Sequence, residues 1–112
     1  MIEAVHHIMG IEDGLHALDV TQLSISDLAD KLVSYVDSLS DQQQGVVIMT
    51  SLKGGSCWNV AVSIARDRPD ILVVAGVNLP MVLTFMSKRD FHPLPELAEI
   101  LLQEAAAGIV RL

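Results

Sequence analysis

Two continuous apolar runs constrain the fold of this chain more than any other feature of its sequence. Residues 46–49 (Val-Val-Ile-Met) and 71–75 (Ile-Leu-Val-Val-Ala) contain no alternating polar residues, a pattern typical of strands buried on both faces. Each run is followed by a turn and then by a helix-like segment, from Trp58 to Arg66 and after Asn78. This alternation predicts a three-layer α/β/α architecture with a mostly parallel sheet.

The residues before the first run contribute two helices and a strand to this prediction. Apolar residues at helical spacing predict a first helix over residues 2–10, and residues 15–20 are expected to form a short strand. Ser24 or Ser26 can cap the next helix. The apolar stripe of that helix comprises Leu28, Leu32, Val36 and Leu39.

The residues after the second run predict a helix and a terminal strand. Pro93 and Pro95 mark the entry to a last helix that ends near Gly108. Residues 109–112 (Ile-Val-Arg-Leu) are expected to form a strand. The chain has 112 residues, which is the size of one domain. We therefore expect residues 1–112 to form a single domain.

Composition and charge exclude several classes of protein. Fourteen acidic against seven basic side chains give a net charge of −7, and such a surface repels nucleic acids and anionic membranes. A single cysteine, Cys57, cannot form an internal disulfide, which fits a reducing compartment. The most apolar stretch, residues 71–86, is shorter than the ~20 residues of a membrane-spanning helix. Because the start of the sequence also has no export signal, we expect a cytoplasmic protein.

Two turns that follow the apolar runs carry the chemical interest. Residues 50–56 read Thr-Ser-Leu-Lys-Gly-Gly-Ser; the two glycines allow a positive φ or close approach to a ligand, and a helix capped by Ser56 offers N–H groups to a phosphate. In the second turn, Asn78 can hydrogen-bond to the first turn or take the left-handed conformation. Parallel strands place both turns at one edge of the sheet, where ligands bind. Ordinary turns with a helix cap explain the same residues, and both interpretations stay open.

Residues 47–59 (Val-Ile-Met-Thr-Ser-Leu-Lys-Gly-Gly-Ser-Cys-Trp-Asn) resemble a signature of the mannose-type IIA components of the sugar phosphotransferase system (PTS). In that family an apolar strand precedes Asp, two variable residues, Gly-Gly-Ser, Pro, an aromatic residue and Asn. Residues 76–81 (Gly-Val-Asn-Leu-Pro-Met) are similar to the family's second signature, which is the more specific match. The first helix, the last helix and the terminal strand fit as well. The resemblance therefore covers the whole chain and implies the family's fold and its usual homodimer.

The resemblance also implies a mechanism and shows where this sequence departs from it. In the family, a histidine between the first strand and the first helix accepts a phosphoryl group from the carrier protein HPr and passes it to a IIB component. This sequence begins within that helix, so we expect the family's first, central strand and its histidine loop to be missing. Ser51 replaces the family's Asp, which orients the histidine, and Cys57 replaces its Pro. A hydroxyl holds an imidazole less well than a carboxylate does. The positions that match the phosphate-facing and partner-facing residues of the family are Ser51, Gly54, Gly55, Ser56, Asn78, Leu79 and Pro80.

The histidines of this sequence do not match the family's acceptor. His6 and His7 lie in the first helix, where His7 can pair with Glu3. His16 starts a strand, and His92 lies in a loop before Pro93. We expect no metal site, because these residues form no convergent set, and no cofactor. Cys57 is either a reactive thiol at a helix start or a packed one.

Three functional hypotheses follow. The first is a IIA-type phosphocarrier domain that works between HPr and a IIB component and is inactive as this chain. We expect it to be a homodimer that is at most peripheral to a membrane sugar permease. The second is a non-catalytic interaction or regulatory homologue of the same fold, which Ser51 at the Asp position supports. The third is a small-anion or nucleotide-binding domain that uses residues 54–56.

Overall fold

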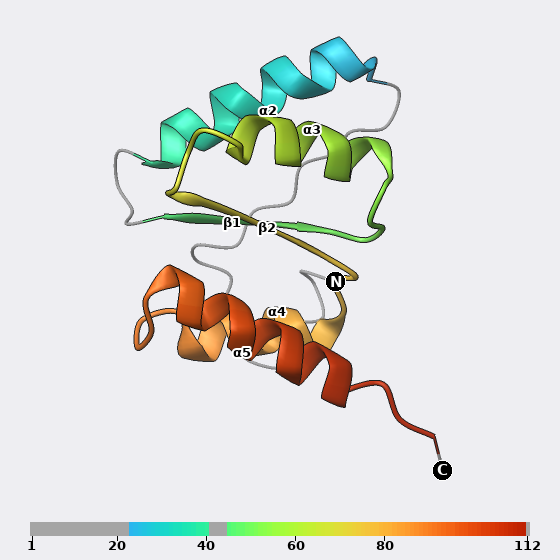
Figure 1. The fold of residues 1–112 in the computed structure, drawn as a ribbon, viewed down its shortest axis with the longest axis vertical. Coiled ribbons are helices and arrows are strands. Elements are labelled where there is room, and N and C mark those ends of the chain that lie inside the picture. Colours follow the sequence, from blue (N-terminus) through green and yellow to red (C-terminus); the bar gives the residue numbers. More distant parts are fainter. Residues whose placement is uncertain (1–22, 41–44, 112) are drawn as a thin grey trace. The chain divides into compact units, whose positions relative to one another are not determined.

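A computed structural model describes residues 23–40 and 45–111 of the chain (Figure 1). The described residues divide into two compact units, residues 23–76 and residues 77–111. The first unit contains α2, β1, α3 and β2, and the second contains α4 and α5. The helix expected at residues 2–10 and the strand expected at residues 15–20 lie outside the described residues.

Helix α2 (Ile25–Ser40) begins the first unit, and Ser24 caps it. The Ser24 hydroxyl accepts a hydrogen bond from the Asp27 N–H at 3.1 Å, and the Ser24 carbonyl accepts one from the Leu28 N–H at 2.9 Å. The first bond satisfies a donor that the start of a helix otherwise leaves without a partner, and the second is the first bond of the helical ladder. From the expected apolar stripe, Leu28 and Val36 are buried. Between the two serines that the sequence left open, the structure selects Ser24.

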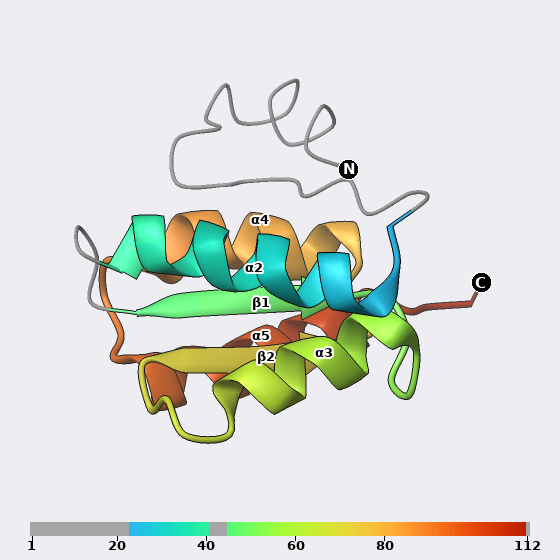
Figure 2. The ribbon, with the colours of Figure 1, turned by 90° about the horizontal axis from the view of Figure 1, so that it is seen from above.

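Strands β1 (Val46–Thr50) and β2 (Ile71–Ala75) pair in parallel, and α3 (Ser56–Ala65) connects them. Helices α2 and α3 cover the same face of this pair (Figure 1), with α2 running beside β1 and α3 beside β2 (Figure 2). The parallel α/β prediction is confirmed. Residues 46–49, however, are half-buried, and in β2 Ile71 and Val74 are buried while Leu72, Val73 and Ala75 are half-buried. The apolar run in β1 therefore indicated a parallel strand correctly and its degree of burial wrongly.

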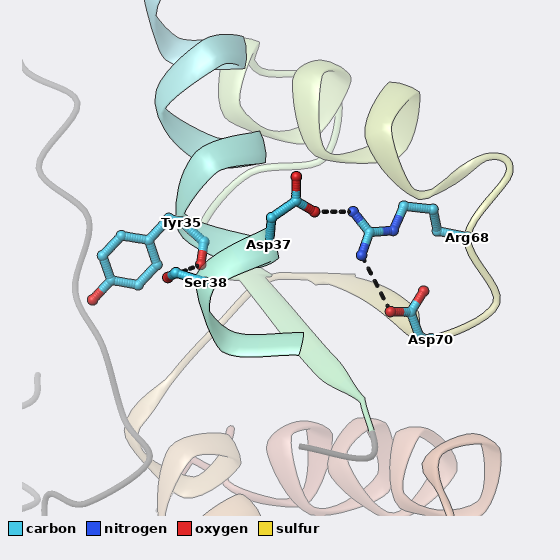
Figure 3. A network of polar contacts seen from close by, with 5 residues as sticks. All are labelled: Tyr35, Asp37, Ser38, Arg68 and Asp70. Carbon is cyan, nitrogen blue, oxygen red and sulfur yellow. Dashed lines mark hydrogen bonds and ion pairs between the residues drawn. The ribbon is translucent and has the colours of Figure 1, made fainter. Parts of the chain in front are cut away.

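Arg68 ties the turn between α3 and β2 to the end of α2 (Figure 3). Its Nη1 atom donates to Asp37 Oδ1 at 2.7 Å, and its Nη2 atom donates to Asp70 Oδ2 at 3.3 Å. The hydrogen bonds to Asp37 and then to Asp70 raise the pKa of the Arg68 guanidinium above its ordinary value. Close to Asp37, the Ser38 hydroxyl donates to the Tyr35 carbonyl at 2.7 Å. These contacts fix the end of the first unit where both strands begin.

The second unit is a pair of packed helices, α4 (Leu79–Lys88) and α5 (Leu94–Ala107). Pro80 lies in the first turn of α4, where a missing N–H costs little. Helix α5 begins after Pro93 and ends at Gly108, as the sequence predicted. The buried side chains of the pair are those of Met81, Val82, Met86, Leu97, Ala98, Leu101 and Ala105.

The strand expected at residues 109–112 is wrong for residues 109–111, which have no regular structure. The Ile109 N–H instead donates to the Ala106 carbonyl at 3.1 Å, which continues the last turn of α5. Ile109 and Val110 are 80% and 81% exposed. A strand needs a neighbouring strand for its backbone hydrogen bonds, and none of the described residues supplies one here. Within the described part of the chain, no helix has the length and apolar character needed to cross a membrane.

Candidate functional site

The parallel register places the ends of β1 and β2 at one edge of the first unit. Thr50 pairs with Ala75, so the turn after β1 and Gly76 after β2 leave the sheet side by side. Thr50 is buried, and its hydroxyl donates to the Val74 carbonyl at 3.3 Å, which adds a side-chain tie at this edge. Ligands of open parallel sheets bind beyond the carboxyl ends of the strands. The edge is therefore the candidate site of this unit.

The turn after β1, which we call the glycine turn (residues 51–55), is shaped by its backbone. Gly54 has a φ of +88°, a conformation that side chains disfavour, and nothing lies within 4 Å of the position where a Cβ would be. The Gly55 N–H donates to the Leu52 carbonyl at 3.2 Å, which closes the turn. Ser51, Leu52 and Lys53 are exposed. The turn thus presents backbone, one serine, one leucine and one lysine to solvent.

Ser56 does not cap α3, contrary to the sequence-based expectation. Gly55 is the N-cap residue, with the extended angles φ −74° and ψ 172°, and Ser56 is the first helical residue. The Gly55 carbonyl accepts the Asn59 N–H at 3.0 Å, so the helical ladder already begins at the glycine. No side chain caps this helix start. Its first N–H groups are the kind of donor to which phosphate groups bind.

Asn59 holds the glycine turn, a role that the sequence analysis did not assign. Its Nδ2 atom donates to the Gly54 carbonyl at 3.3 Å from the first turn of α3. The available signal was its place in the matched pattern, where Asn follows the aromatic Trp58. Asn59 also lines a shallow hollow of about 260 Å³ between α2 and α3. That hollow is mostly apolar, with Ile25 and Val60 among its lining residues, so a phosphate group suits the glycine turn better.

The turn of Asn78, Leu79 and Pro80 lies in the second unit, and its asparagine caps α4. Asn78 Oδ1 accepts the Met81 N–H at 3.0 Å, and Asn78 Nδ2 donates to the Ala105 carbonyl at 2.9 Å. Of the options that the sequence left open, the structure selects an ordinary turn in which Asn78 caps a helix that Pro80 opens; the φ of Asn78 is −137°, and Gly76, with φ +78°, takes the left-handed conformation. A bond from Asn78 to the glycine turn, the other option, stays untested because it would join the two units. That the two turns share one rim stays a prediction.

The other titratable candidates of the described residues form no site. His92 Nδ1 lies 3.0 Å from Glu96 Oε1, one helical turn further along α5. Cys57 is a half-buried free thiol in α3. Among residues 23–40 and 45–111, no three His, Cys, Asp or Glu side chains converge as metal ligands. Glu3, His6, His7 and His16 lie outside the described residues.

Comparison with known proteins reveals relatives in one family of sugar-transport components. The chain is 33% identical over 70 residues to the PTS system mannose-specific EIIAB component of Escherichia coli K12, an alignment that spans 62% of this chain and 22% of that protein. It is 32% identical over 82 residues to the sorbose-specific EIIA component of Lacticaseibacillus casei, which spans 72% of this chain and 58% of that protein. The chain thus spans about a fifth of the first relative and somewhat over half of the second.

Solved structures share the fold. The EIIA component of Streptococcus agalactiae superimposes with a TM-score of 0.87 and 21% identity over 98% of this chain and 85% of that one. The mannose/sorbose-specific IIA subunit of Enterococcus faecalis gives a TM-score of 0.65 and 26% identity over 82% of this chain and 67% of that one. The expected IIA-like α/β fold is confirmed by these likenesses.

A family model supplies the last comparison. The model described as EIIA-man, the PTS system fructose IIA component, matches residues 1–102. This match includes both the glycine turn and the Asn78 turn, the two segments on which the resemblance was based. The chain belongs to the EIIA-man family of PTS IIA components.

Proposed function

We propose that this chain provides the scaffold of a IIA-type phosphocarrier domain and that the 112-residue polypeptide itself accepts no phosphoryl group at the family's position. The observation that carries the proposal is the residue after β1. Ser51 is an exposed residue at the edge of the sheet, and the resemblance implies that it stands where the family's motif has Asp. The resemblance also implies that none of the four histidines, His6, His7, His16 and His92, matches the family's acceptor.

The proposed partners are HPr and a IIB component, with this domain between them in the cytoplasm. In such a relay the N–P bond of phosphorylated HPr breaks as a new one forms on the IIA histidine, and the group then moves on to IIB. The protein's contribution is to orient the imidazole and to stabilise the charge of the transferred group. For the second task we propose the uncapped start of α3, from Ser56 on, beside Ser51 and Gly54 of the glycine turn. Ser51 lacks the carboxylate for the first.

The decisive experiment is incubation of the 112-residue chain with phosphorylated HPr, followed by mass spectrometry under conditions that preserve phosphohistidine. We expect no transfer to the wild-type chain and none to Ser51→Asp, because a carboxylate orients an acceptor histidine and does not replace it. A family IIA protein with both Asp and histidine is the positive control. Stable phosphohistidine on the wild-type chain would overturn the proposal.

A second candidate function, a non-catalytic interaction or regulatory homologue, is favoured by Ser51 alone. Ser51 removes the orienting carboxylate independently of any histidine. The two functions differ in what the coding DNA upstream of Met1 contains. An open frame that encodes a strand and a histidine loop favours the phosphocarrier, whereas stop codons in every upstream frame favour the regulatory homologue.

A further inference from the structure

Asn78 uses each of its two polar side-chain atoms inside the second unit. Oδ1 accepts the Met81 N–H at 3.0 Å and so caps α4. Nδ2 donates to the Ala105 carbonyl at 2.9 Å, across 27 residues of sequence. The side chain is partly buried rather than free in solvent. One residue at the start of α4 therefore holds the last turn of α5.

A second contact brings the same two helix ends together. A Cβ added to Gly108 would lie 2.5 Å from Pro80 Cγ, closer than real Cβ atoms approach other atoms, and 3.0 Å from Pro80 Cβ, which is a tight contact. Gly108 ends α5 and Pro80 lies in the first turn of α4. The absence of a side chain at Gly108 is thus what allows α5 to approach the proline ring.

The start of α4 has few N–H groups left for a ligand. Pro80 has none, the Met81 N–H is bound by Asn78 Oδ1, and the Val82 N–H donates to the Asn78 carbonyl at 3.2 Å. By contrast, α3 begins at the glycine turn without a side-chain cap. The two motifs thus differ chemically, since an anion needs unoccupied donors.

We propose that Asn78, Pro80 and Gly108 form a clasp that joins the start of α4 to the end of α5, and that Asn78 is a positioning residue rather than a phosphate or partner ligand. The clasp fixes the point at which residues 109–111 leave α5, next to the first turn of α4. It replaces the motif-based assignment of Asn78 and Pro80 to a phosphate-facing or partner-facing surface. The inference holds whether or not the chain relays phosphoryl groups.

The test separates the two bonds of Asn78 by amide hydrogen exchange. Asn78→Asp keeps an oxygen for the Met81 N–H and loses the donor to Ala105, whereas Asn78→Ala loses both. In Asn78→Asp we expect the amides of Gly108 and Ile109 to exchange roughly tenfold faster, the effect of one lost hydrogen bond, with the Met81 amide unchanged. In Asn78→Ala all three amides should exchange faster. Asn59→Asp, the same chemical change in the first unit, is the matched control and should leave all three as in the wild type.

A second pair of variants keeps the test decisive if Asn78→Asp folds poorly. Gly108→Ala should accelerate exchange at Ile109, and adding Pro80→Ala should restore it, because the ring that the new methyl meets is gone. Unchanged exchange at Gly108 and Ile109 in both Asn78→Asp and Gly108→Ala would overturn the clasp. So would a titration with inorganic phosphate that shifts the Asn78 side-chain amide signals, since that result would make Asn78 a ligand.

Discussion

Leu101→Ala probes the core of the second unit, because the Leu101 side chain is 0% exposed. Its neighbours on the same face of α5, Leu97, Ala98 and Ala105, are buried as well, so the cavity left by the truncation has little room to collapse. Buried Leu→Ala changes lower the free energy of unfolding by about 2–5 kcal/mol. For this site we expect a loss of about 3 kcal/mol in the free energy of unfolding. With an entropy of unfolding of about 2.1 cal/mol/K per residue and a chain of this length, that loss lowers Tm by about 13 °C.

Leu102→Ala is the matched control, since Leu102 is the next residue of the same helix and is 46% exposed. We expect it to change the free energy of unfolding by about 0.5 kcal/mol or less. Urea titrations followed by circular dichroism give both values. Equal losses from the two substitutions would refute the orientation of α5 on which the buried face depends.

The same variant tests the proposal that residues 1–112 form one domain. The single tryptophan, Trp58, lies in α3 of the first unit, while Leu101 lies in the second. If both units unfold as one cooperative domain, Leu101→Ala lowers the urea midpoint of Trp58 fluorescence as much as that of circular dichroism. A Trp58 transition that stays at the wild-type midpoint would show that the units unfold separately.

Three further predictions concern the glycine turn, the Arg68 contacts and the tail. Gly54→Ala should lower the free energy of unfolding by about 1 kcal/mol, because φ is +88° there and the added methyl group contacts nothing. Gly55→Ala, at φ −74°, should lower it less, and urea titrations that rank the two variants the other way would contradict the turn geometry. Arg68→Gln should lower Tm in dilute buffer and progressively less as NaCl is added, since salt screens its contact with Asp37; a salt-independent loss would speak against an ionic role. Deleting residues 109–112 should convert the expected homodimer to a monomer in sedimentation experiments, and unchanged sedimentation would rule out the tail as the dimer contact.

Much of the local structure could be predicted because it depends on neighbouring residues. The runs at residues 46–49 and 71–75 predicted parallel strands with bounds that agree with β1 and β2 to within one residue. Pro80 and Gly108 marked helix ends for reasons of backbone geometry alone. The glycine turn was located correctly for the same reason, since Gly54 takes the positive φ that its residue type allows.

The missed features depend on partners distant in sequence or on a choice between adjacent residues. The bond from Asn78 to Ala105 spans 27 residues, and no pattern around Asn78 indicates it. Ser56 was expected to cap α3 because its hydroxyl suits the role, yet Gly55 takes the extended conformation one residue earlier. The terminal strand failed because apolar residues predict a strand without showing whether another strand lies beside it.

The two hydrogen bonds that shape the glycine turn do not depend on the side chain at position 51. The turn is closed by the bond from the Gly55 N–H to the Leu52 carbonyl and held by Asn59 Nδ2 on the Gly54 carbonyl. Neither bond involves the side chain of Ser51, which is exposed. If position 51 corresponds to the family's Asp, as the resemblance implies, Ser51 removes a carboxylate and leaves these two bonds in place. We therefore expect the turn to keep the same shape with Ser or with Asp at position 51, so that Ser51→Asp tests phosphotransfer without altering the fold.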